Sequence, residues 1–391
     1  MVVIPYGRQN ISEADIDAVV DVLRSDYLTQ GSAVPEFEAC ITNYCNVKYA
    51  VAVNSATSAL HIACLALGVG KGDIVWTSPI TFVASANCAL YCGGSIDFVE
   101  IEPATGNICV DSLASKLLVA EKAGKLPKVV IPVHLSGNSC DMKKIHALSK
   151  RYGFKVIEDA SHGIGGKYDN ENIGCCTYSD ITVFSFHPVK IITTGEGGMA
   201  TTNNPEYASQ MNLLRSHGVT RDEKLMTGAV DGPWYYEQIK LGFNYRMNDI
   251  QAALGISQMN RLDDFVIARH KIVSKYRTLL QNLPVTLPSC SLDSYSSFHL
   301  YIIKLEGSSN AFHKNVFEFM RENGVGINLH YMPVYLQPYY SSLGFSKGYC
   351  PEAENYYVQA ISMPIYPGLK FEEQRKVATI LKEAIQYEPS S

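Results

Sequence analysis

Short apolar segments alternate with amphipathic ones along roughly the first 270 residues of the chain. The apolar segments predict strands at 49–55, 73–79, 95–101, 128–134, 154–160 and 180–186. Segments with helical character that end at glycines follow at 56–68, 81–94 and 141–153. Short, almost wholly apolar strands between helices indicate a mainly parallel sheet that is buried on both faces. We therefore expect an α/β fold whose functional residues lie where strands end and helices begin.

The pattern changes after Arg246. A long stretch with a helical period follows and predicts two helices, and short mixed segments begin at about residue 295. A final amphipathic helix is expected at 371–385. This texture predicts a large α/β domain with an N-terminal arm over residues 1–250 and a smaller α+β domain over 251–391.

Composition places the chain among ordinary globular proteins and excludes several functions. The 391 residues are 47% hydrophobic and carry a net charge of −5, so there is no basic surface for nucleic acid. The eleven cysteines are scattered without a C-x-x-C pair, which favours reduced core cysteines over disulfides or a metal site. No signal sequence or membrane-spanning run is present, so the expected location is the cytoplasm.

The segment "SFHPVKIITTGEGG" (185–198) places a lysine and a glycine turn after a predicted strand. It is compatible with a phosphate loop, a lysine that holds a cofactor, or a surface turn. Neither of the two commonest phosphate loops is present anywhere in the chain. The Walker A spacing fails at Gly166-Lys167, and the dinucleotide fingerprint fails at Gly68-Val69-Gly70.

Four further features of the sequence, considered together with Lys190, bear on which kind of site this segment forms. Asp159 closes a buried strand, where a carboxylate needs a partner, although it could also cap the next helix. The "NSATSALH" segment (54–61) begins a helix with hydroxyls and free N–H groups, which suits an anion as well as plain capping. Ser185 ends another strand, and Phe82 could stack on a ring. Together with Lys190, this set matches what pyridoxal phosphate requires.

Several motifs resemble the DegT/StrS-type nucleotide-sugar aminotransferases. They are "EDASHGIGGKY", "SFHPVKIITTGEGG", "LRSHG" and "GFNYRMNDIQAALGISQMNRLD", in the order and spacing of that family over nearly the whole chain. The resemblance implies the type I aspartate aminotransferase fold, with a mainly parallel central sheet. It also implies a homodimer whose two active sites are each built from both subunits.

The resemblance further assigns roles to individual residues. Lys190 would hold pyridoxal 5'-phosphate as an internal aldimine and then move the proton, with pyridoxamine phosphate as the intermediate form. Asp159 would pair with the pyridine nitrogen, and Phe82 would cover the ring. The other expected cofactor contacts are Ala56, Thr57 and Ser185 at the phosphate, Asn244 from the partner subunit, and His162 near the phenolic oxygen.

Within the family, the chain resembles most the UDP-4-amino-4,6-dideoxy-N-acetyl-beta-L-altrosamine transaminases of pseudaminic acid biosynthesis. That branch implies transfer of an amino group from L-glutamate, which leaves 2-oxoglutarate, to C4 of a UDP-linked 4-keto-6-deoxy N-acetylhexosamine. The implied substrate contacts are Tyr6, Asp26, Tyr27, Leu28, Thr29, His187, Asn328, Leu329, His330, Tyr331 and Tyr340.

Three alternatives remain at this point. Another nucleotide-sugar 4- or 3-aminotransferase would have nearly the same motifs. A sugar dehydratase on the same scaffold lacks the Schiff-base lysine, so Lys190 argues against it. A cofactor-binding regulator would need a DNA-binding extension, for which about twelve residues before the first expected helix leave no room.

Overall fold

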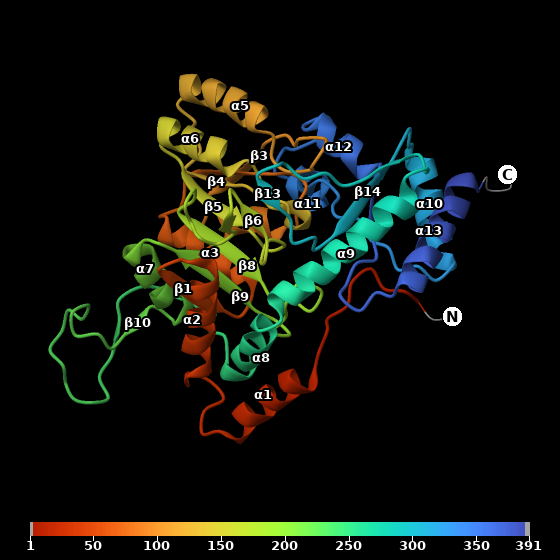
Figure 1. Cartoon of the computed structure of the whole chain (residues 1–391). Coiled ribbons are helices and arrows are strands. Elements are labelled where there is room, and N and C mark those ends of the chain that lie inside the picture. Colours follow the sequence, from red (N-terminus) through yellow and green to blue (C-terminus); the bar gives the residue numbers. More distant parts are fainter. Residues whose placement is uncertain (1–2, 388–391) are drawn as a thin grey trace.

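A seven-stranded sheet forms the centre of the large domain in the computed structural model, which describes residues 3–387 (Figure 1). The strands lie in the order β1-β9-β8-β5-β4-β2-β3. Their bounds are β1 Tyr49–Val53, β2 Ile74–Thr77, β3 Ser95–Phe98, β4 Val129–Ile131, β5 Lys155–Asp159, β8 Ile181–Ser185 and β9 Gly198–Thr202. Strand β9 pairs antiparallel with both β1 and β8, whereas the other pairs are parallel. The expected mainly parallel sheet is confirmed.

Helices cover both faces of this sheet, as the apolar strands predict. Helices α3 (Ala56–Ala66), α4 (Ala84–Tyr91) and α7 (Pro205–Arg215) pack on one face. The opposite face is covered by α2 (Ala33–Cys45), α5 (Val110–Ala123), α6 (Met142–Tyr152) and α8 (Asp249–Met259). Strand β4 shows the two-residue alternation: Val129 and Ile131 join the core under α3, while Val130 joins the core under α5 and α6.

A second core forms around a three-stranded antiparallel sheet in the C-terminal part of the chain. The sheet consists of β12 (Val285–Thr286), β14 (Tyr301–Leu305) and β15 (Ala360–Met363), and α10 (Asn310–Glu322) and α13 (Phe371–Gln386) pack on it. Helix α9 (Leu262–Leu280) spans both parts (Figure 1). Its residues Phe265 and Val266 pack in the large-domain core, and Ile272 and Val273 pack in the C-terminal one.

The remaining elements are short, apart from α1. They are α1 Glu13–Arg24, η1 Leu135–Gly137, β6 Lys167–Tyr168, β7 Glu171–Asn172, β10 Val219–Thr220, β11 Glu237–Gln238, β13 Ser294–Tyr295, η2 Val334–Leu336, α11 Pro338–Ser341 and α12 Pro351–Tyr357. The segment that contains β10 and β11 projects away from the body of the molecule (Figure 1). None of the helices between residues 3 and 387 is long and apolar enough to cross a membrane.

The N-terminal arm is fastened at two points. Ile4 bridges Val325 in the C-terminal part, and α1 packs along α8. The fully buried carboxylate of Asp15 accepts hydrogen bonds from Ser257 (2.6 Å) and Gln258 (2.8 Å) of α8. These contacts hold the chain between Ile4 and α1 against the body of the molecule.

The last glycine of the "GEGG" turn lets a helix begin directly beside the sheet. Gly198 starts β9, opposite Ser185 of β8 and Val53 of β1. A Cβ at Gly198 would lie 2.5 Å from the backbone nitrogen of Ala56 and 2.6 Å from the carbonyl oxygen of Ser55. Those backbone atoms belong to the first turn of α3, so a side chain at Gly198 would push this helix start off the sheet.

We therefore expect Gly198→Ala to lower the free energy of unfolding by about 2–3 kcal/mol, because backbone atoms yield less than a flexible side chain would. Urea denaturation measures this loss. The control is Gly70→Ala, since a Cβ at Gly70 meets nothing within 4 Å. Its effect should stay within about 0.5 kcal/mol. Equal losses in the two variants would contradict the close approach of β9 and α3.

Candidate active site

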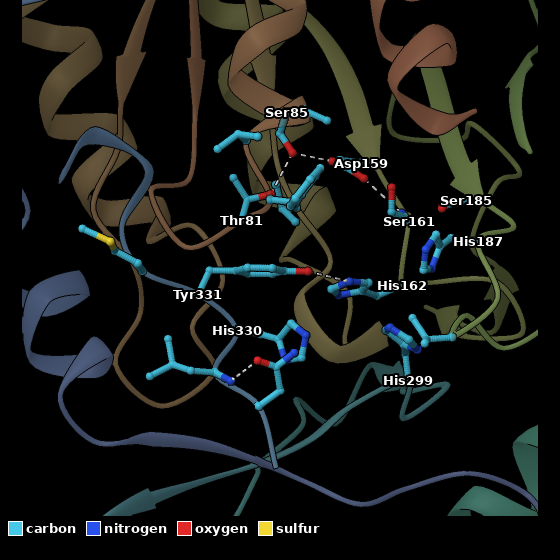
Figure 2. A pocket seen from close by; sticks show the side chains of 18 of the residues that line it. Thr81, Ser85, Asp159, Ser161, His162, Ser185, His187, His299, His330 and Tyr331 are labelled. Carbon is cyan, nitrogen blue, oxygen red and sulfur yellow. Dashed lines mark hydrogen bonds between the residues drawn. The ribbon is translucent and has the colours of Figure 1, made fainter. Parts of the chain in front are cut away.

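A cavity of about 1110 Å³ lies where the carboxyl ends of β1, β5 and β8 meet (Figure 2). Parallel strands bring their ends to one edge of a sheet, and a cleft at that edge is the usual ligand site of open α/β folds. Segments from the C-terminal part close the other side. Of the residues expected in the site, the following line the cavity: Tyr6, Ala56, Thr57, Phe82, Asp159, His162, Ser185, His187, Lys190, Asn328, Leu329, His330 and Tyr331.

The start of α3 offers hydrogen-bond donors to an anion. Ser55 caps the helix, and its hydroxyl accepts from the N–H of Ser58 (3.1 Å). Within residues 3–387, the N–H groups of Ala56 and Thr57 have no acceptor. They lie at the positive end of the helix dipole, beside the hydroxyls of Thr57 and Ser185 in the cavity wall. This set of donors is suited to a phosphate group.

Asp159 presents a buried carboxylate to the cavity. Its side chain is 4% exposed and accepts from the Ser85 hydroxyl (2.5 Å) and the Ser161 backbone N–H (3.0 Å). None of the basic side chains of residues 3–387 forms an ion pair with it. A buried carboxylate without a cationic partner is costly, so the site is suited to a ligand that carries a positive N–H.

Lys190 is held in the cavity wall by the residues that follow it. Ile191 and Ile192 are buried in the large-domain core, and the Thr193 hydroxyl and Thr194 N–H both donate to the carbonyl of Phe186 at 3.0 Å. The ammonium group itself has no hydrogen-bond or ion-pair partner among residues 3–387. Burial lowers the pKa of Lys190 from 10.5 to about 8, although the Asp159 carboxylate opposes the shift.

His162 is a neutral hydrogen-bond donor in this site. The backbone N–H of Ser136 points at its Nδ1 (3.3 Å), so Nδ1 must accept and Nε2 carries the proton. Burial, assisted by the charge of Lys190, holds the pKa of His162 well below its usual value of 6.5. The Nε2–H then faces the hydroxyl of Tyr331 at 3.3 Å (Figure 2).

Two more histidines stay neutral around the same space. His330 contacts the Ser362 hydroxyl through Nδ1 (2.7 Å), and burial together with Lys190 lowers its pKa to about 4. His299 packs on His162 with ring centroids 4.4 Å apart, and burial likewise lowers its pKa. Neutral imidazoles leave Lys190 as the candidate for positive charge in this part of the cavity.

Phe82 offers a free aromatic face. Its side chain is 60% exposed although it lines the cavity, and its ring centroid lies 6.5 Å from that of Tyr331. An aromatic residue left open in a cavity wall is available to stack on a flat ligand.

Some of the expected site residues lie outside the cavity of this chain. Asn244 is exposed at a bridge with Ser216, and the 26–29 segment (Asp26, Tyr27, Leu28 and Thr29) is exposed on the surface. Tyr340 is 2% exposed within the large-domain core, where its hydroxyl donates to Asn87 (2.6 Å). Tyr340 therefore lies in the core and is not among the residues that line the cavity.

The structure also brings in residues that the sequence reasoning missed. Thr81 and Ser85 stand beside Phe82, and their spacing of four residues in a predicted helix start was an available signal. His299 had no such signal, because it precedes β14 far along the chain. One face of α10 also lines the cavity through Asn310, His313, Lys314, Phe317 and Glu318.

The donor set fits pyridoxal phosphate. The start of α3 suits its phosphate, Asp159 suits a protonated ring nitrogen, Phe82 suits the ring face, and the unpartnered amine of Lys190 suits the aldehyde. Together with the mainly parallel sheet and the smaller α+β part, these features define a pyridoxal-phosphate-dependent aminotransferase of fold type I.

Comparison with known proteins specifies the family. Residues 9–382 match the model of the DegT/DnrJ/EryC1/StrS aminotransferase family, and the chain belongs to that family. It is 37% identical, over 97% of its length and 96% of the relative's, to the UDP-4-amino-4,6-dideoxy-N-acetyl-beta-L-altrosamine transaminase of Campylobacter jejuni subsp. jejuni serotype O:23/36 (strain 81-176). Aminotransferases of this family depend on pyridoxal phosphate and act on sugars.

Solved structures agree with this assignment. Helicobacter pylori PseC, an aminotransferase involved in the biosynthesis of pseudoaminic acid, matches with a TM-score of 0.89 at 30% identity, covering 98% of this chain and 99% of that one. The sugar aminotransferase Spr1654 of Streptococcus pneumoniae in its PMP form matches with the same TM-score, identity and coverage. The fold and the enzyme class expected from the sequence are confirmed.

The lowered pKa of Lys190 can be measured in the cofactor-free protein. Only the neutral amine reacts with acetic anhydride, so acetylation of Lys190 should reach half its maximal rate near pH 8. Exposed Lys144 is the internal control, because its ion pair with Asp141 raises its pKa above 10.5. Peptide mass spectrometry at a series of pH values from about 6.5 to 11, a range that includes the ordinary lysine pKa, distinguishes the acetylation of Lys190 from that of Lys144.

Asp159→Asn should move the Lys190 half-point to lower pH, because the carboxylate that stabilises the ammonium form is then gone. A half-point for Lys190 equal to that of Lys144 would contradict the lowered pKa of the unpartnered Lys190 amine.

Proposed function

We propose that the protein transfers an amino group from L-glutamate to C4 of a UDP-linked 4-keto-6-deoxy N-acetylhexosamine, giving UDP-4-amino-4,6-dideoxy-N-acetyl-beta-L-altrosamine. The observation that carries the chemistry is the unpartnered amine of Lys190 in a cavity between the start of α3 and Asp159. The sugar is proposed from the similarity to the Campylobacter transaminase and to PseC.

Each residue has a specific task in this proposal. Bound pyridoxal phosphate supplies an aldehyde and a ring that withdraws electrons. Lys190 would hold the aldehyde and, as a neutral amine, would carry the proton to and from the donor carbon. Asp159 would keep the ring nitrogen protonated, and Phe82 would cover the ring face. The Nε2–H of His162 faces the Tyr331 hydroxyl, and the neutral tautomer would allow it to donate to the phenolic oxygen of the cofactor.

The size of the cavity supports a large substrate. Pockets that enclose a drug-sized ligand have volumes of about 300–1,000 Å³. At about 1110 Å³ the cavity exceeds this range, and it continues from Lys190 along one face of α10. There His313, Lys314 and Phe317 offer polar, cationic and aromatic side chains. A nucleotide sugar has phosphates and a base that could use such groups, whereas an amino acid alone would leave this part unused.

We also propose a homodimer in which Asn244 reaches the cofactor phosphate of the partner subunit. Asn244 is exposed in this chain and lies close along the chain to Leu241, whose side chain is 80% exposed. Tyr27 and Leu28 of the 26–29 segment are likewise exposed. Apolar side chains exposed around polar candidate site residues are typical of a surface that a second subunit covers. The 26–29 segment would contact substrate from that surface.

Lys190→Ala should abolish turnover while the protein still binds the cofactor noncovalently. Removal of the residue that both holds the aldehyde and moves the proton should cost about 10³-fold or more in kcat. Steady-state assays with L-glutamate and the UDP-4-keto sugar, together with absorbance of the dialysed protein, measure both effects. Leu343→Ala, an exposed change on the surface, serves as the control and should keep normal activity. Undiminished turnover of Lys190→Ala would refute the proposed role.

The sugar itself is tested by product analysis. The protein, loaded with pyridoxal phosphate and given L-glutamate, should aminate the UDP-linked 4-keto-6-deoxy N-acetylhexosamine. Its kcat/KM should exceed those for GDP- or dTDP-linked 4-keto and 3-keto sugars by about tenfold or more, as expected for one unmatched polar contact. Mass spectrometry and NMR identify the product. Preference for another nucleotide or for a 3-keto sugar would replace the proposed substrate with the alternative aminotransferase of the same family.

A further inference from the structure

The hydroxyl groups of Thr81 and Ser85 form two successive hydrogen bonds that end at the Asp159 carboxylate. The Ser85 hydroxyl donates to Oδ2 of Asp159 at 2.5 Å, and the hydroxyls of Thr81 and Ser85 lie 2.7 Å apart (Figure 2). Thr81 is 3% exposed, Ser85 1% and Asp159 4%, so water does not compete for these bonds. None of the roles described above accounts for these two hydrogen bonds.

The direction of donation follows from counting protons. An ionised carboxylate accepts only, so Ser85 uses its single hydroxyl proton on Asp159. The remaining bond must then be donated by Thr81 to Ser85. Ser161 N–H holds the other oxygen of the carboxylate at 3.0 Å. With a donor fixed on each oxygen, the plane of the carboxylate is set, and hydrogen bonds to a charged acceptor are the stronger kind.

The same two hydroxyls also fix the segment that carries Phe82. Thr81 and Ser85 flank Phe82 in the sequence, and the backbone N–H of Ser85 donates to the carbonyl of Phe82 at 3.2 Å. Ser85 lies in the first turn of α4. One hydrogen-bonded unit thus connects the residue expected on the ring face to the residue expected at the ring nitrogen.

We propose that Ser85 and Thr81 are positioning residues that orient the Asp159 carboxylate toward the ring nitrogen of the cofactor. The inference rests on the proposed role of Asp159 as the partner of that nitrogen. Ser85 acts directly on the carboxylate, and Thr81 acts through Ser85. Loss of Ser85 would free one carboxylate oxygen to rotate, which weakens the bond to the ring N–H.

Binding to the cofactor-free protein tests this proposal without recourse to activity. Two ligands are compared: pyridoxal phosphate, and its 1-deaza analogue, in which a carbon replaces the ring nitrogen. Ser85→Ala should lower the affinity for pyridoxal phosphate by about tenfold, as expected for loss of a hydrogen bond to a charged group. Thr81→Val should lower the same affinity by about threefold. Neither change should alter binding of the analogue, which offers Asp159 no N–H.

Conservative variants separate positioning from folding. Ser85→Thr and Thr81→Ser keep the hydroxyls and should bind pyridoxal phosphate as the unchanged protein does. Valine has nearly the same shape as threonine but lacks the hydroxyl, so Thr81→Val provides the test if Ser85→Ala does not fold. Fluorescence titration gives the affinities, and melting temperatures report the fold.

Equal losses for both ligands would show a merely structural effect and overturn the proposal, as would unchanged affinity of Ser85→Ala for pyridoxal phosphate. Failure of the unchanged protein to bind pyridoxal phosphate would instead overturn the proposed function on which the inference rests.

Discussion

The arrangement of the site depends on a partly buried lysine amine that has no hydrogen-bond or ion-pair partner among residues 3–387. An ammonium group loses its hydration on burial, and only the Asp159 charge opposes the resulting fall in the pKa of Lys190 to about 8. A substantial part of the amine is therefore neutral and nucleophilic near physiological pH. Such a state persists only where the surrounding structure holds it, and here the buried Ile191 and Ile192 anchor the loop.

The central sheet supplies that structure by bringing three strand ends to one edge. β1 leads into α3, β5 ends at Asp159, and β8 ends at Ser185, so donors for an anion and an acceptor for a cation line the same cavity as Lys190. Gly198 permits the start of α3 to lie directly against β9. The 328–331 segment of the C-terminal part then closes the cavity with His330 and Tyr331. Because residues from both the large sheet and the C-terminal part line the site, the cavity between them is large enough for a nucleotide sugar.

Local features of the sequence allowed much of this site to be predicted. Asp159 and Ser185 are the last residues of short apolar strands, and Lys190 and the start of α3 come soon after such strands. Strand ends are set by local pattern. Features that depend on packing could not be read in this way. His299, far along the chain, packs against His162, and Tyr340 is buried with its hydroxyl donating to Asn87. The roles of Asn244 and the 26–29 segment remain predictions, since they depend on a second subunit.

Reduction of the pyridoxal-phosphate-loaded protein with borohydride, followed by peptide mass spectrometry, tests the central claim most directly. Borohydride converts a lysine–aldehyde linkage into a stable secondary amine on the lysine that formed it. The account predicts a phosphopyridoxyl group on the peptide that contains Lys190, while peptides with exposed lysines such as Lys144 stay unmodified. Labelling of a different lysine, or of none, would contradict it.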